Sequence, residues 1–542
     1  MGAIGVPDDL LAAARERLIR VLGRDAVLLD EDEIAEFRDP YAGAGEAAHR
    51  PSFVVQPSTV AEVQHVVRIA SDLGVPLWTS STGRNYGYGG SAPVVSGSVV
   101  LSLRRMNRIL DIDEGAACAL VEPGVTFAGL HAELRARGSA LWMSVPDLGW
   151  GSIVGNSLEH GYGYAVTGDH ASAVCGMEVV LASGEVVRTG LGAVGDGAMW
   201  QRHKRAFGPS LDSLFMQSNF GIVTKMGVWL VPRPEAFTTG SVTCDGEDGI
   251  VRLVDALRPL VLDGTIQGLP LIVSSPEPAG GRAAPFSDTR ALPKERRLSA
   301  ALPQERWHAR IAFYGPAAVV RAREEVVRQR LAGVPGLTIE LRDYGGDVRP
   351  EDLHPLDLVP AGVPNMLLMD ALTRHLGDRF GHLDFSPVIP FDGAAAARHE
   401  RMVRDVLAAH GLVAGFAWIA SSRSLVGACM VLFDVDDEAE RTAARLAVGE
   451  MVERAAAWGW TEYRGHPMLA ERIAATLDFG DRALSRTYAA IKDALDPRGI
   501  LSPGNHGIWP SRRHRTANDL VGDAVGESPA WTASLSRCRG AP

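Results

Sequence analysis

Lysine is scarce in this 542-residue sequence, although lysine and arginine together number 54. Arginine therefore supplies almost all of the positive charge, and we interpret this bias as that of a bacterial protein from a GC-rich genome. The bias by itself indicates nothing about mechanism. The lysines are Lys204, Lys225, Lys294 and Lys492.

Cysteine is also scarce, and its five copies are scattered without a CxxC pair. An odd number of dispersed cysteines argues against a disulfide framework and against a zinc site, and it fits a reducing cytoplasm. We therefore expect a cytoplasmic protein with no metal site. The cysteines are Cys118, Cys175, Cys244, Cys429 and Cys538.

A stripe of positive charge and a long apolar run are both missing. The net charge is -11, which argues against nucleic acid or an anionic membrane as the main partner. No apolar run reaches the length that spans a bilayer. Near the N-terminus, Asp8 and Asp9 stand where a signal peptide would carry positive charge, so we expect an ordinary helix after Pro7.

The remaining composition is that of a globular protein, with 46% hydrophobic and 22% charged residues. The length allows two or more domains with a large core. Short helix-like and strand-like patterns follow one another without a regular βαβ array, so the sequence predicts a mixed α+β fold.

The clearest local patterns place individual elements. Residues 58–74 predict a helix with Ser58 as its N-cap and Gly74 as its stop. A hairpin is expected over 176–190, with Ser183 and Gly184 at its turn. Further strands are expected over 75–81, 97–103, 118–125 and 221–234, and further helices over 126–138 and 482–495.

Two stretches break this pattern. Glycine and proline are dense between residues 265 and 300, which predicts a long surface excursion. A second region then continues to about residue 460. Residues 513–542 are small and polar with little periodicity, so we expect them to form a tail.

The segment "STGRNYGYGG", residues 81–90, follows a predicted strand and contains four glycines. A glycine-rich turn after a strand usually presents backbone N–H groups to phosphate. A Rossmann loop would start a helix at once, whereas proline and another strand follow here. By itself the cluster fits a tight surface loop equally well. A second glycine-rich segment over 146–170 favours a long ligand with a diphosphate between the two.

Five segments resemble a known family: "STGRNYGYGG", "VPDLGWGSIVGN", "GYGYAVTGDH", "FGPSLDSLFMQSNFGIVTKMGVWLVP" and "DPRGILSPG". They are similar, in the same order, to the vanillyl-alcohol oxidase / p-cresol methylhydroxylase flavoproteins, and most similar to the 4-phenol-oxidising branch of vanillyl-alcohol and eugenol oxidases. The likeness spans most of residues 36–510 and is thinner in the middle.

The resemblance implies a two-domain α+β fold. An FAD-binding domain is expected from residues 1–235 and 460–512, a cap domain over the substrate from 236–459, and the tail from 513–542. The glycines of the first loop would let the backbone approach two phosphates. The residues that the resemblance assigns to FAD are Ser81, Thr82, Gly83, Arg84, Asn85, Gly87, Pro146, Gly149, Ser152, Gly155, Asn156, Gly221, Ile222 and Val223.

His382 stands in "GHLDFSPV", where the resemblance implies a covalent bond to the 8α methyl carbon of FAD. A lone histidine is more often an ordinary polar residue, but Gly381, Phe385 and Pro387 also match the motif. Such a bond would raise the flavin potential. The methylhydroxylase branch uses tyrosine here and passes electrons to a cytochrome, so histidine favours an oxidase.

The resemblance implies that Tyr88, Tyr463 and Arg464 bind the substrate as its phenolate, since two phenol donors and a guanidinium stabilise that anion. Taken alone, Tyr463 and Arg464 would fit a surface strand. Asp147 matches an acid near flavin N5, where it could stabilise positive charge on the para-quinone methide or activate water. Taken alone, Asp147 would fit a turn.

The sequence departs from the family pattern on the cap side. Asp384 stands where relatives carry phenylalanine or glycine, Ala417 replaces a larger or polar residue, and Asn505 replaces a lysine. We expect Asp384 and Asp147 to flank the reacting carbon and to favour a larger or more polar para substituent. The alternative is that Asp384 forms a salt bridge with a cap arginine.

Three functions remain open. The first is an oxidase of para-substituted phenols with covalent FAD, which transfers hydride to the flavin and then reduces O2 to hydrogen peroxide. The second is a dehydrogenase or hydroxylase with a separate acceptor, which the absence of a CxxCH haem motif disfavours. The third is a flavin-binding protein without turnover, which would not need a phenolate site. We expect the oxidase, acting as a homodimer or a higher homo-oligomer.

Overall fold

A four-stranded sheet with order β1–β2–β4–β3 lies in the N-terminal part of the chain. Strands β2, β4 and β3 are parallel, while β1 is antiparallel to β2. Helices α1 and α3 bury apolar residues in one core with this sheet. The computed structural model describes residues 6–43, 46, 48–195, 197–246, 248–274, 306–377 and 379–511. The elements are α1 (Asp8–Leu22), β1 (Val27–Leu28), α2 (Glu31–Ala35), β2 (Val54–Val55), α3 (Val60–Leu73), β3 (Leu77–Ser80) and β4 (Val99–Ser102).

Helix α3 begins one residue later than the sequence predicts. Thr59 is the N-cap, and its side chain accepts the Glu62 N–H at 3.2 Å. Ser58 instead donates its own N–H and hydroxyl to the Glu62 carboxylate. The Ser58 N-cap was therefore wrong, because both residues can cap and only the path of the chain selects between them. Gly74 ends the helix in the left-handed conformation, as expected.

A five-stranded antiparallel sheet with order β5–β6–β10–β8–β9 follows. Its β8–β9 hairpin turns at Gly184, which confirms the predicted hairpin. A short pair, β7 and β11, leads to the next domain. The elements are β5 (Ile109–Asp113), β6 (Cys118–Val121), α4 (Phe127–Ala136), β7 (Leu141–Trp142), α5 (Ile153–Leu158), α6 (His170–Ala173), β8 (Val174–Val180), β9 (Val186–Arg188), β10 (Ile222–Trp229) and β11 (Val231–Pro232).

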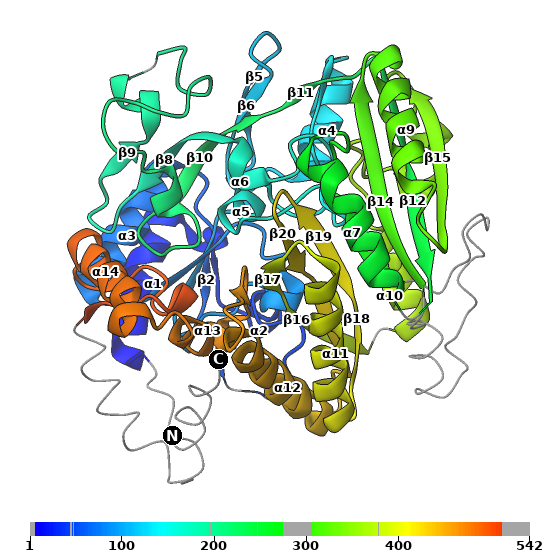
Figure 1. Cartoon of the computed structure of the whole chain (residues 1–542). Coiled ribbons are helices and arrows are strands. Elements are labelled where there is room, and N and C mark those ends of the chain that lie inside the picture. The colour runs from blue at the N-terminus through cyan, green and yellow to red at the C-terminus, as the bar shows by residue number, and fades with distance from the viewer. Residues whose placement is uncertain are drawn as a thin grey trace.

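An eight-stranded sheet with order β15–β12–β14–β13–β19–β20–β17–β22 dominates the second half. Helices α7, α9, α11 and α12 share one apolar core with this sheet. Figure 1 shows α7, α9, β12, β14 and β15 on one side of the molecule and α1, α3 and α14 on the other. The strands are β12 (Ala236–Asp245), β13 (Leu271–Ser274), β14 (Arg306–Gly315), β15 (Leu337–Gly345), β17 (Pro387–Pro390), β19 (Ala417–Ser421), β20 (Ser424–Gly427) and β22 (Thr461–Glu462).

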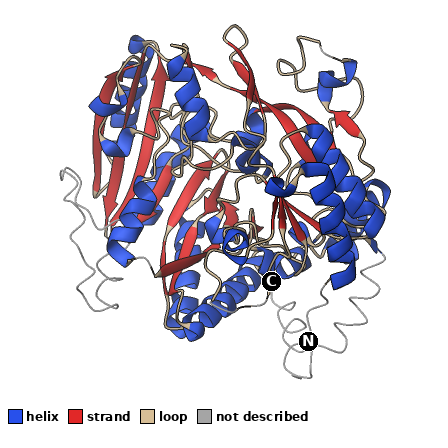
Figure 2. Cartoon of the chain, turned by 180° about the vertical axis from the view of Figure 1, so that it is seen from behind, coloured by secondary structure: helices blue, strands red, loops and turns tan. Residues whose placement is uncertain are grey.

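The long strands of this sheet stand together on the left of Figure 2. Strand β14 alternates, with Trp307, Ala309 and Ile311 buried in the helix-covered core. Its intervening residues therefore face away from that core, and Arg310 is one of them. The helices of this half are α7 (Gly249–Leu262), α9 (Ala317–Leu331), α10 (Leu367–Leu376), α11 (Gly393–Ala409) and α12 (Glu438–Ala456).

A three-stranded sheet with order β16–β21–β18 and a closing segment complete the fold. The closing segment returns to the first sheet, where Leu501 forms a parallel bridge with Leu77. Within the ranges that the structure describes, no helix is both long and apolar enough to cross a bilayer. The elements are β16 (Phe380–Phe385), β18 (Val413–Gly415), β21 (Cys429–Asp434), α13 (Ala470–Ala475) and α14 (Phe479–Leu495).

The mixture of helices with separate sheets confirms the predicted α+β fold. The start of the predicted surface excursion was wrong: residues 271–274 form β13, inside the eight-stranded sheet between β14 and β19. Residues 275–305 and the predicted tail over 513–542 lie outside the described residues. The domain limits stay predictions, and we note that β22, just past residue 460, pairs with β17 of the eight-stranded sheet.

Three histidines with lowered pKa values predict that acid destabilises the fold. Burial lowers the pKa of His399 to about 3, and of His170 and His308 to about 4. In the unfolded chain each would titrate near 6.5. The unfolded state therefore binds more protons below that pH, so stability is present above about pH 6.5 and is lost as pH falls toward the folded pKa values.

His399→Leu tests this prediction, because neither ring nitrogen of His399 has a partner among the described residues. We expect the variant to remove roughly 2 kcal/mol of the loss in unfolding free energy between pH 7 and pH 5. Urea titrations at the two pH values measure it. His65→Gln, at an exposed histidine of α3, is the control and should leave the pH dependence unchanged.

Candidate functional site

The first glycine segment forms the loop after β3. Gly83, Gly89 and Gly90 have φ of 72°, 85° and 60°, a left-handed conformation that glycine adopts without strain. A side chain at Gly83 would also collide with Ser91 Oγ. A short 3₁₀ helix, Tyr86–Tyr88, lies between these glycines. Backbone without side chains therefore lies close to neighbouring residues in this loop.

The second glycine segment begins helix α5. Ser152 caps this helix by accepting the Gly155 N–H at 3.0 Å, and its hydroxyl donates to the Pro123 carbonyl at 2.6 Å. A Cβ on Gly155 would collide with the Ser81 hydroxyl. The two glycine segments are therefore in contact, with no room between them for a side chain at this point.

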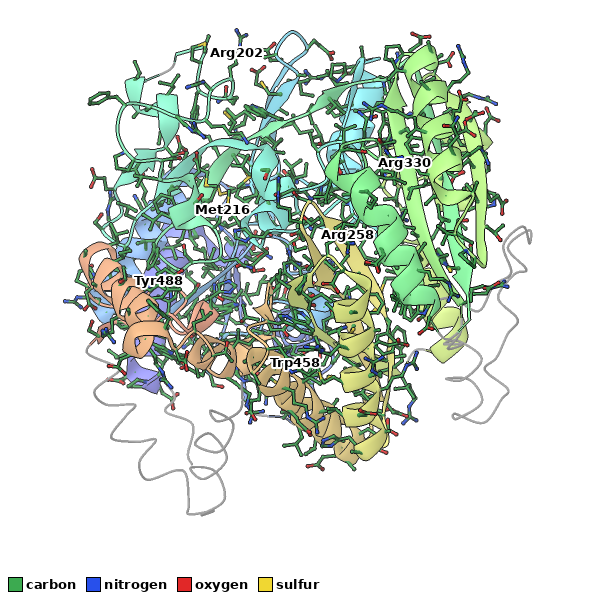
Figure 3. The ribbon with its side chains drawn as sticks, viewed as in Figure 1. Arg202, Met216, Arg258, Arg330, Trp458 and Tyr488 are labelled. Atoms are coloured by element: carbon green, nitrogen blue, oxygen red, sulfur yellow. The ribbon has the colours of Figure 1, made fainter. Side chains whose placement is uncertain are left out.

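A cavity of about 490 Å³ lies between the two glycine segments and the closing part of the chain. Met216 and Tyr488, both labelled in Figure 3, line it from far apart in the sequence. Ten of the residues that the sequence assigned to FAD line this cavity: Ser81, Thr82, Gly83, Arg84, Asn85, Ser152, Gly155, Asn156, Gly221 and Val223. Gly87, Pro146, Gly149, Ile222 and His382 are not among the lining residues.

The sequence reasoning missed other lining residues. Ser218 and Asn219 stand just before Gly221, in the motif "MQSNFG", and the serine hydroxyl and the asparagine Oδ1 are buried without a partner among the described residues. Buried polar atoms of this kind call for a polar ligand. The motif was the available signal. Also missed were Glu159, His160, Gln217, Ser502 and His506.

Tyr88, Tyr463 and Arg464, which we call the Tyr–Arg cluster, meet at this cavity and all three line it. The Arg464 Cζ lies 5.3 Å from the Tyr88 ring centroid and 5.2 Å from that of Tyr463. The guanidinium donates to the Glu159 carbonyl from Nε at 3.0 Å and from Nη2 at 2.6 Å. The cluster thus gathers a fixed positive charge and two phenols at one wall.

Burial raises the pKa of Tyr88 well above its usual value. Nearby Tyr463 and Asp384 raise it further, whereas Arg464 lowers it. Tyr88 is half-buried and lines the cavity. Its hydroxyl oxygen lies 2.7 Å from Ser386 Oγ. A tyrosine that keeps its proton can donate a hydrogen bond to an anion in the cavity.

Glu159 carries a negative charge behind the Tyr–Arg cluster. Burial works against this charge, but His506, Arg464 and His160 outweigh it and lower the pKa of the carboxyl to about 2. Its Oε1 lies 3.3 Å from His506 Nε2. The carbonyl of this residue therefore orients Arg464, while its carboxylate is paired elsewhere.

Asp147 forms an ion pair with Arg310 of strand β14. The two guanidinium nitrogens lie 2.9 and 3.2 Å from the two carboxylate oxygens. The Arg310 Cζ also sits 4.3 Å from the Tyr164 ring centroid. Asp147 does not line the cavity described above. It is a paired carboxylate that links the second glycine segment to the eight-stranded sheet.

His382 and Asp384 stand two residues apart on β16. His382 Nε2 lies 3.8 Å from Asp384 Oδ1, too far for a hydrogen bond. A Cβ on Gly87 would collide with the Asp384 carboxylate, and the His382 ring is its next neighbour. His382 lines a second, small cavity of about 20 Å³, and its ring centroid is 4.9 Å from that of Tyr41.

The two predicted pocket carboxylates have different neighbours. Asp384 interacts with His382, Arg464 and Tyr88, whereas Asp147 pairs with Arg310. Within the described residues no ion pair joins Asp384 to an arginine, and no contact joins it to Asp147. Ala417 begins β19, is half-buried and does not line the main cavity. The flanking role of both acids therefore stays a prediction.

Comparison with known proteins identifies the group to which the chain is similar. The FAD binding domain family matches residues 51–190, and the family of FAD linked oxidase C-terminal domains matches residues 395–506. The chain is 34% identical over 518 residues to the 4-cresol dehydrogenase (hydroxylating) flavoprotein subunit of Pseudomonas putida. The aligned part covers 93% of this chain and 97% of that protein.

Two solved structures have the same fold. A 4-ethylphenol oxidase from Gulosibacter chungangensis, in complex with isoeugenol, matches with a TM-score of 0.83 and 32% identity, over 94% of this chain and 99% of its own. A p-cresol methylhydroxylase with bound substrate matches with a TM-score of 0.83 and 31% identity, over 93% of this chain and 98% of its own.

The cavity fits the FAD that these families bind. Two glycine segments without room for side chains border it, and unpartnered polar atoms of Ser218 and Asn219 lie on its wall, as a long polar cofactor requires. The enzyme is an FAD-dependent oxidoreductase, and the chain belongs to the vanillyl-alcohol oxidase / p-cresol methylhydroxylase flavoprotein family.

Proposed function

We propose that this protein is an oxidase of para-substituted phenols with covalently bound FAD. The observation that supports it most is the convergence of the Tyr–Arg cluster on the cavity bordered by both glycine segments. A flavin-binding protein without turnover would gain nothing from a buried guanidinium and two phenols at this wall. The relatives named for cresol and ethylphenol support the same substrate class.

The Tyr–Arg cluster binds the substrate oxygen in this proposal. A phenol with a pKa near 10 must lose its proton before its para carbon releases hydride easily. The fixed charge of Arg464 and the hydroxyl protons of Tyr88 and Tyr463 stabilise the resulting phenolate in a site that excludes water. The bonds from Arg464 to the Glu159 carbonyl hold the guanidinium in place before substrate arrives.

The FAD, when bound, supplies the acceptor for the hydride from the benzylic carbon. The two glycine segments, Ser218 and Asn219 would hold it. Asp147 would then face the substrate carbon that has become electron-poor in the para-quinone methide. Since both oxygens of Asp147 are engaged by Arg310, the proposal gives it the role of stabilising charge in preference to that of a free base for water.

Oxygen is the proposed final acceptor, with hydrogen peroxide as the product. The histidine at position 382 and the absence of a CxxCH motif in the chain support this choice. The second candidate is a dehydrogenase with a separate acceptor, which the name of the Pseudomonas putida relative favours. Purified protein with 4-ethylphenol or p-cresol should consume O2 and form peroxide. Turnover only with an added cytochrome or dye would establish the second candidate instead.

His382 is proposed to carry the FAD covalently. Its ring packs against Gly87, next to a residue that lines the cavity, and its Nδ1 is buried without a partner among the described residues. On a denaturing gel under ultraviolet light, flavin fluorescence should travel with the polypeptide. In His382→Ala the flavin should bind through the glycine segments, separate on denaturation and react more slowly, because its potential falls.

The matched control for this gel is Asp384→Asn, which leaves the histidine in place and should keep the fluorescence in the protein band. Free flavin from the wild-type protein would contradict the covalent bond. Fluorescence that stays with the His382→Ala band would show that another residue forms it.

A further inference from the structure

Two carboxyl groups, Asp384 and Glu462, lie behind the Tyr–Arg cluster. Glu462 directly precedes Tyr463, and its Oε2 accepts the Ser386 N–H at 2.6 Å. The hydroxyl of the same serine is the partner of Tyr88 at 2.7 Å. Asp384 packs against the residue before Tyr88, and the Tyr88 hydroxyl lowers the pKa of this carboxyl through a side-chain hydrogen bond. Asp384 therefore lies beside the Tyr88 hydroxyl, and Glu462 is linked to the same hydroxyl through Ser386.

Neither acid has a full set of partners. Asp384 Oδ1 and Glu462 Oε1 are buried and accept no hydrogen bond among the described residues. Burial raises the pKa of Asp384 despite opposition from His382 and Arg464, and burial together with the Asp384 charge raises the pKa of Glu462 much further. Two adjacent buried carboxylates would be costly, so the pair holds one proton and one charge.

The proton of the resting pair belongs mainly to Glu462. Four groups favour the charged form of Asp384, whereas Glu462 gains only the Ser386 N–H. Of this pair only Asp384 is then charged, and it shares the positive charge of Arg464 with the charged Glu159. The titratable and charged groups that face Asp384 are Tyr41, Tyr88, His382, Cys429, Glu462, Arg464 and His466.

We propose that Asp384 accepts the proton that the phenolic substrate loses on binding, with Tyr88 as the relay. The substrate O–H bond breaks and its proton goes to the Tyr88 oxygen, while the proton of Tyr88 goes to the Asp384 carboxylate. One negative charge moves from Asp384 to the substrate oxygen, no electrons are transferred, and no proton leaves for solvent. Asp384 acts through Tyr88 and is a positioning residue for the phenolate.

Charge balance is the physical reason why the proton goes to Asp384 and not to solvent. Releasing the phenol proton to solvent would add a negative charge on the substrate to those of Asp384 and Glu159, which both already interact with Arg464. Transfer to Asp384 keeps the net charge constant, which matters most where water does not screen it. The inference rests on the proposed function, since it requires that substrate binds as the phenolate.

The test counts protons in the holoenzyme. 4-Chlorophenol, which has no benzylic hydrogen to lose, is bound at neutral pH in weak buffer with an indicator dye, and the phenolate is measured by its ultraviolet difference band. The wild type should release far fewer protons than the number of phenolates formed. Asp384→Asn should release as many protons as phenolates and should form the band only at higher pH.

Conservative variants separate this role from a structural one. Asp384→Glu keeps a carboxylate and should again retain the proton. Glu462→Gln mimics the protonated acid and should retain it as well. Asp212→Asn alters another buried acid of raised pKa, which is bonded to Thr189 and is absent from the cluster, so its proton count should equal that of the wild type.

Each result of this proton count either supports the inference or overturns it. A wild-type phenolate band with one proton released for each phenolate would overturn the inference alone, whether or not Asp384→Asn folds. Proton retention that persists in Asp384→Asn would overturn it too, because another group would then be the acceptor. Absence of a phenolate band in the wild type would contradict the proposed function and, with it, this inference.

Discussion

Arg464→Met is expected to lower kcat/KM for para-substituted phenols by about ten- to a hundredfold. A charge-assisted hydrogen bond to a buried phenolate contributes roughly 1.5–3 kcal/mol, and this substitution removes it from the transition state as well as from the bound substrate. Steady-state kinetics with a 4-alkylphenol measure the loss. Phenolate formation, followed by difference absorbance with 4-chlorophenol, should weaken in parallel.

Arg464→Lys is the matched control, since lysine keeps the charge but not the planar pair of donors that reaches the Glu159 carbonyl. Its rate should lie between those of the wild type and Arg464→Met. Flavin content and melting temperature show whether either variant is damaged. If para-methoxy analogues are oxidised as fast as the phenols, or if Arg464→Met is fully active, then the cluster does not bind a phenolate.

Lys492→Met is expected to lower the free energy of unfolding by about 3–5 kcal/mol. Lys492 and Asp496 are both fully buried, with Nζ and Oδ2 at 2.8 Å. Removal of the ammonium leaves a buried carboxylate without its counter-charge, which accounts for a loss of this size. Burial lowers the pKa of Lys492 to about 8, so its ammonium is charged at neutral pH. Denaturant titration measures the change.

The same substitution should weaken FAD binding, because Lys492 also holds the cavity wall. Its Nζ donates to the carbonyls of Asn219 and Leu501 at 2.6 and 2.7 Å, and both residues line the cavity. Adding Asp496→Asn removes the uncompensated charge and should recover much of the stability but not the bonds to the wall.

An exposed ion pair is the control for this experiment. Arg20 and Glu16 pair on the surface of α1 at 2.7 Å, so Arg20→Met should cost less than about 1 kcal/mol. Equal losses of unfolding free energy in Arg20→Met and Lys492→Met would show that burial does not determine how much the Lys492–Asp496 pair contributes to stability. A double variant as unstable as Lys492→Met alone would point to the lost carbonyl contacts instead of the charge.

Much of the fold follows from local patterns in the sequence. The helix that becomes α3 and the hairpin of β8 and β9 were predictable because helical spacing, an αL glycine stop and a two-residue turn are properties of neighbouring residues. The glycine segments were recognisable for the same reason, and eight of their predicted residues line the cavity. Strand β13 was missed because four residues inside a stretch rich in glycine and proline carry too little periodicity.

The rest of the site depends on residues that are far apart in the chain. The pattern over 482–495 predicts an amphipathic helix, yet nothing in it shows that Lys492 is buried against carbonyls from Asn219 and Leu501. Likewise, Asp147 meets Arg310 only because strand β14 turns that side chain away from the helix-covered core.

The sequence by itself determined the family, the α+β class, the two glycine segments and the predicted members of the Tyr–Arg cluster, because these reside in short motifs and local conformation. The tertiary structure alone decided which charges meet. It paired Asp147 with Arg310, placed Asp384 beside Tyr88, and put Glu462 on the other side of Ser386. The physical reason is that desolvation and Coulomb interaction depend on distance and burial, which packing sets and sequence spacing does not.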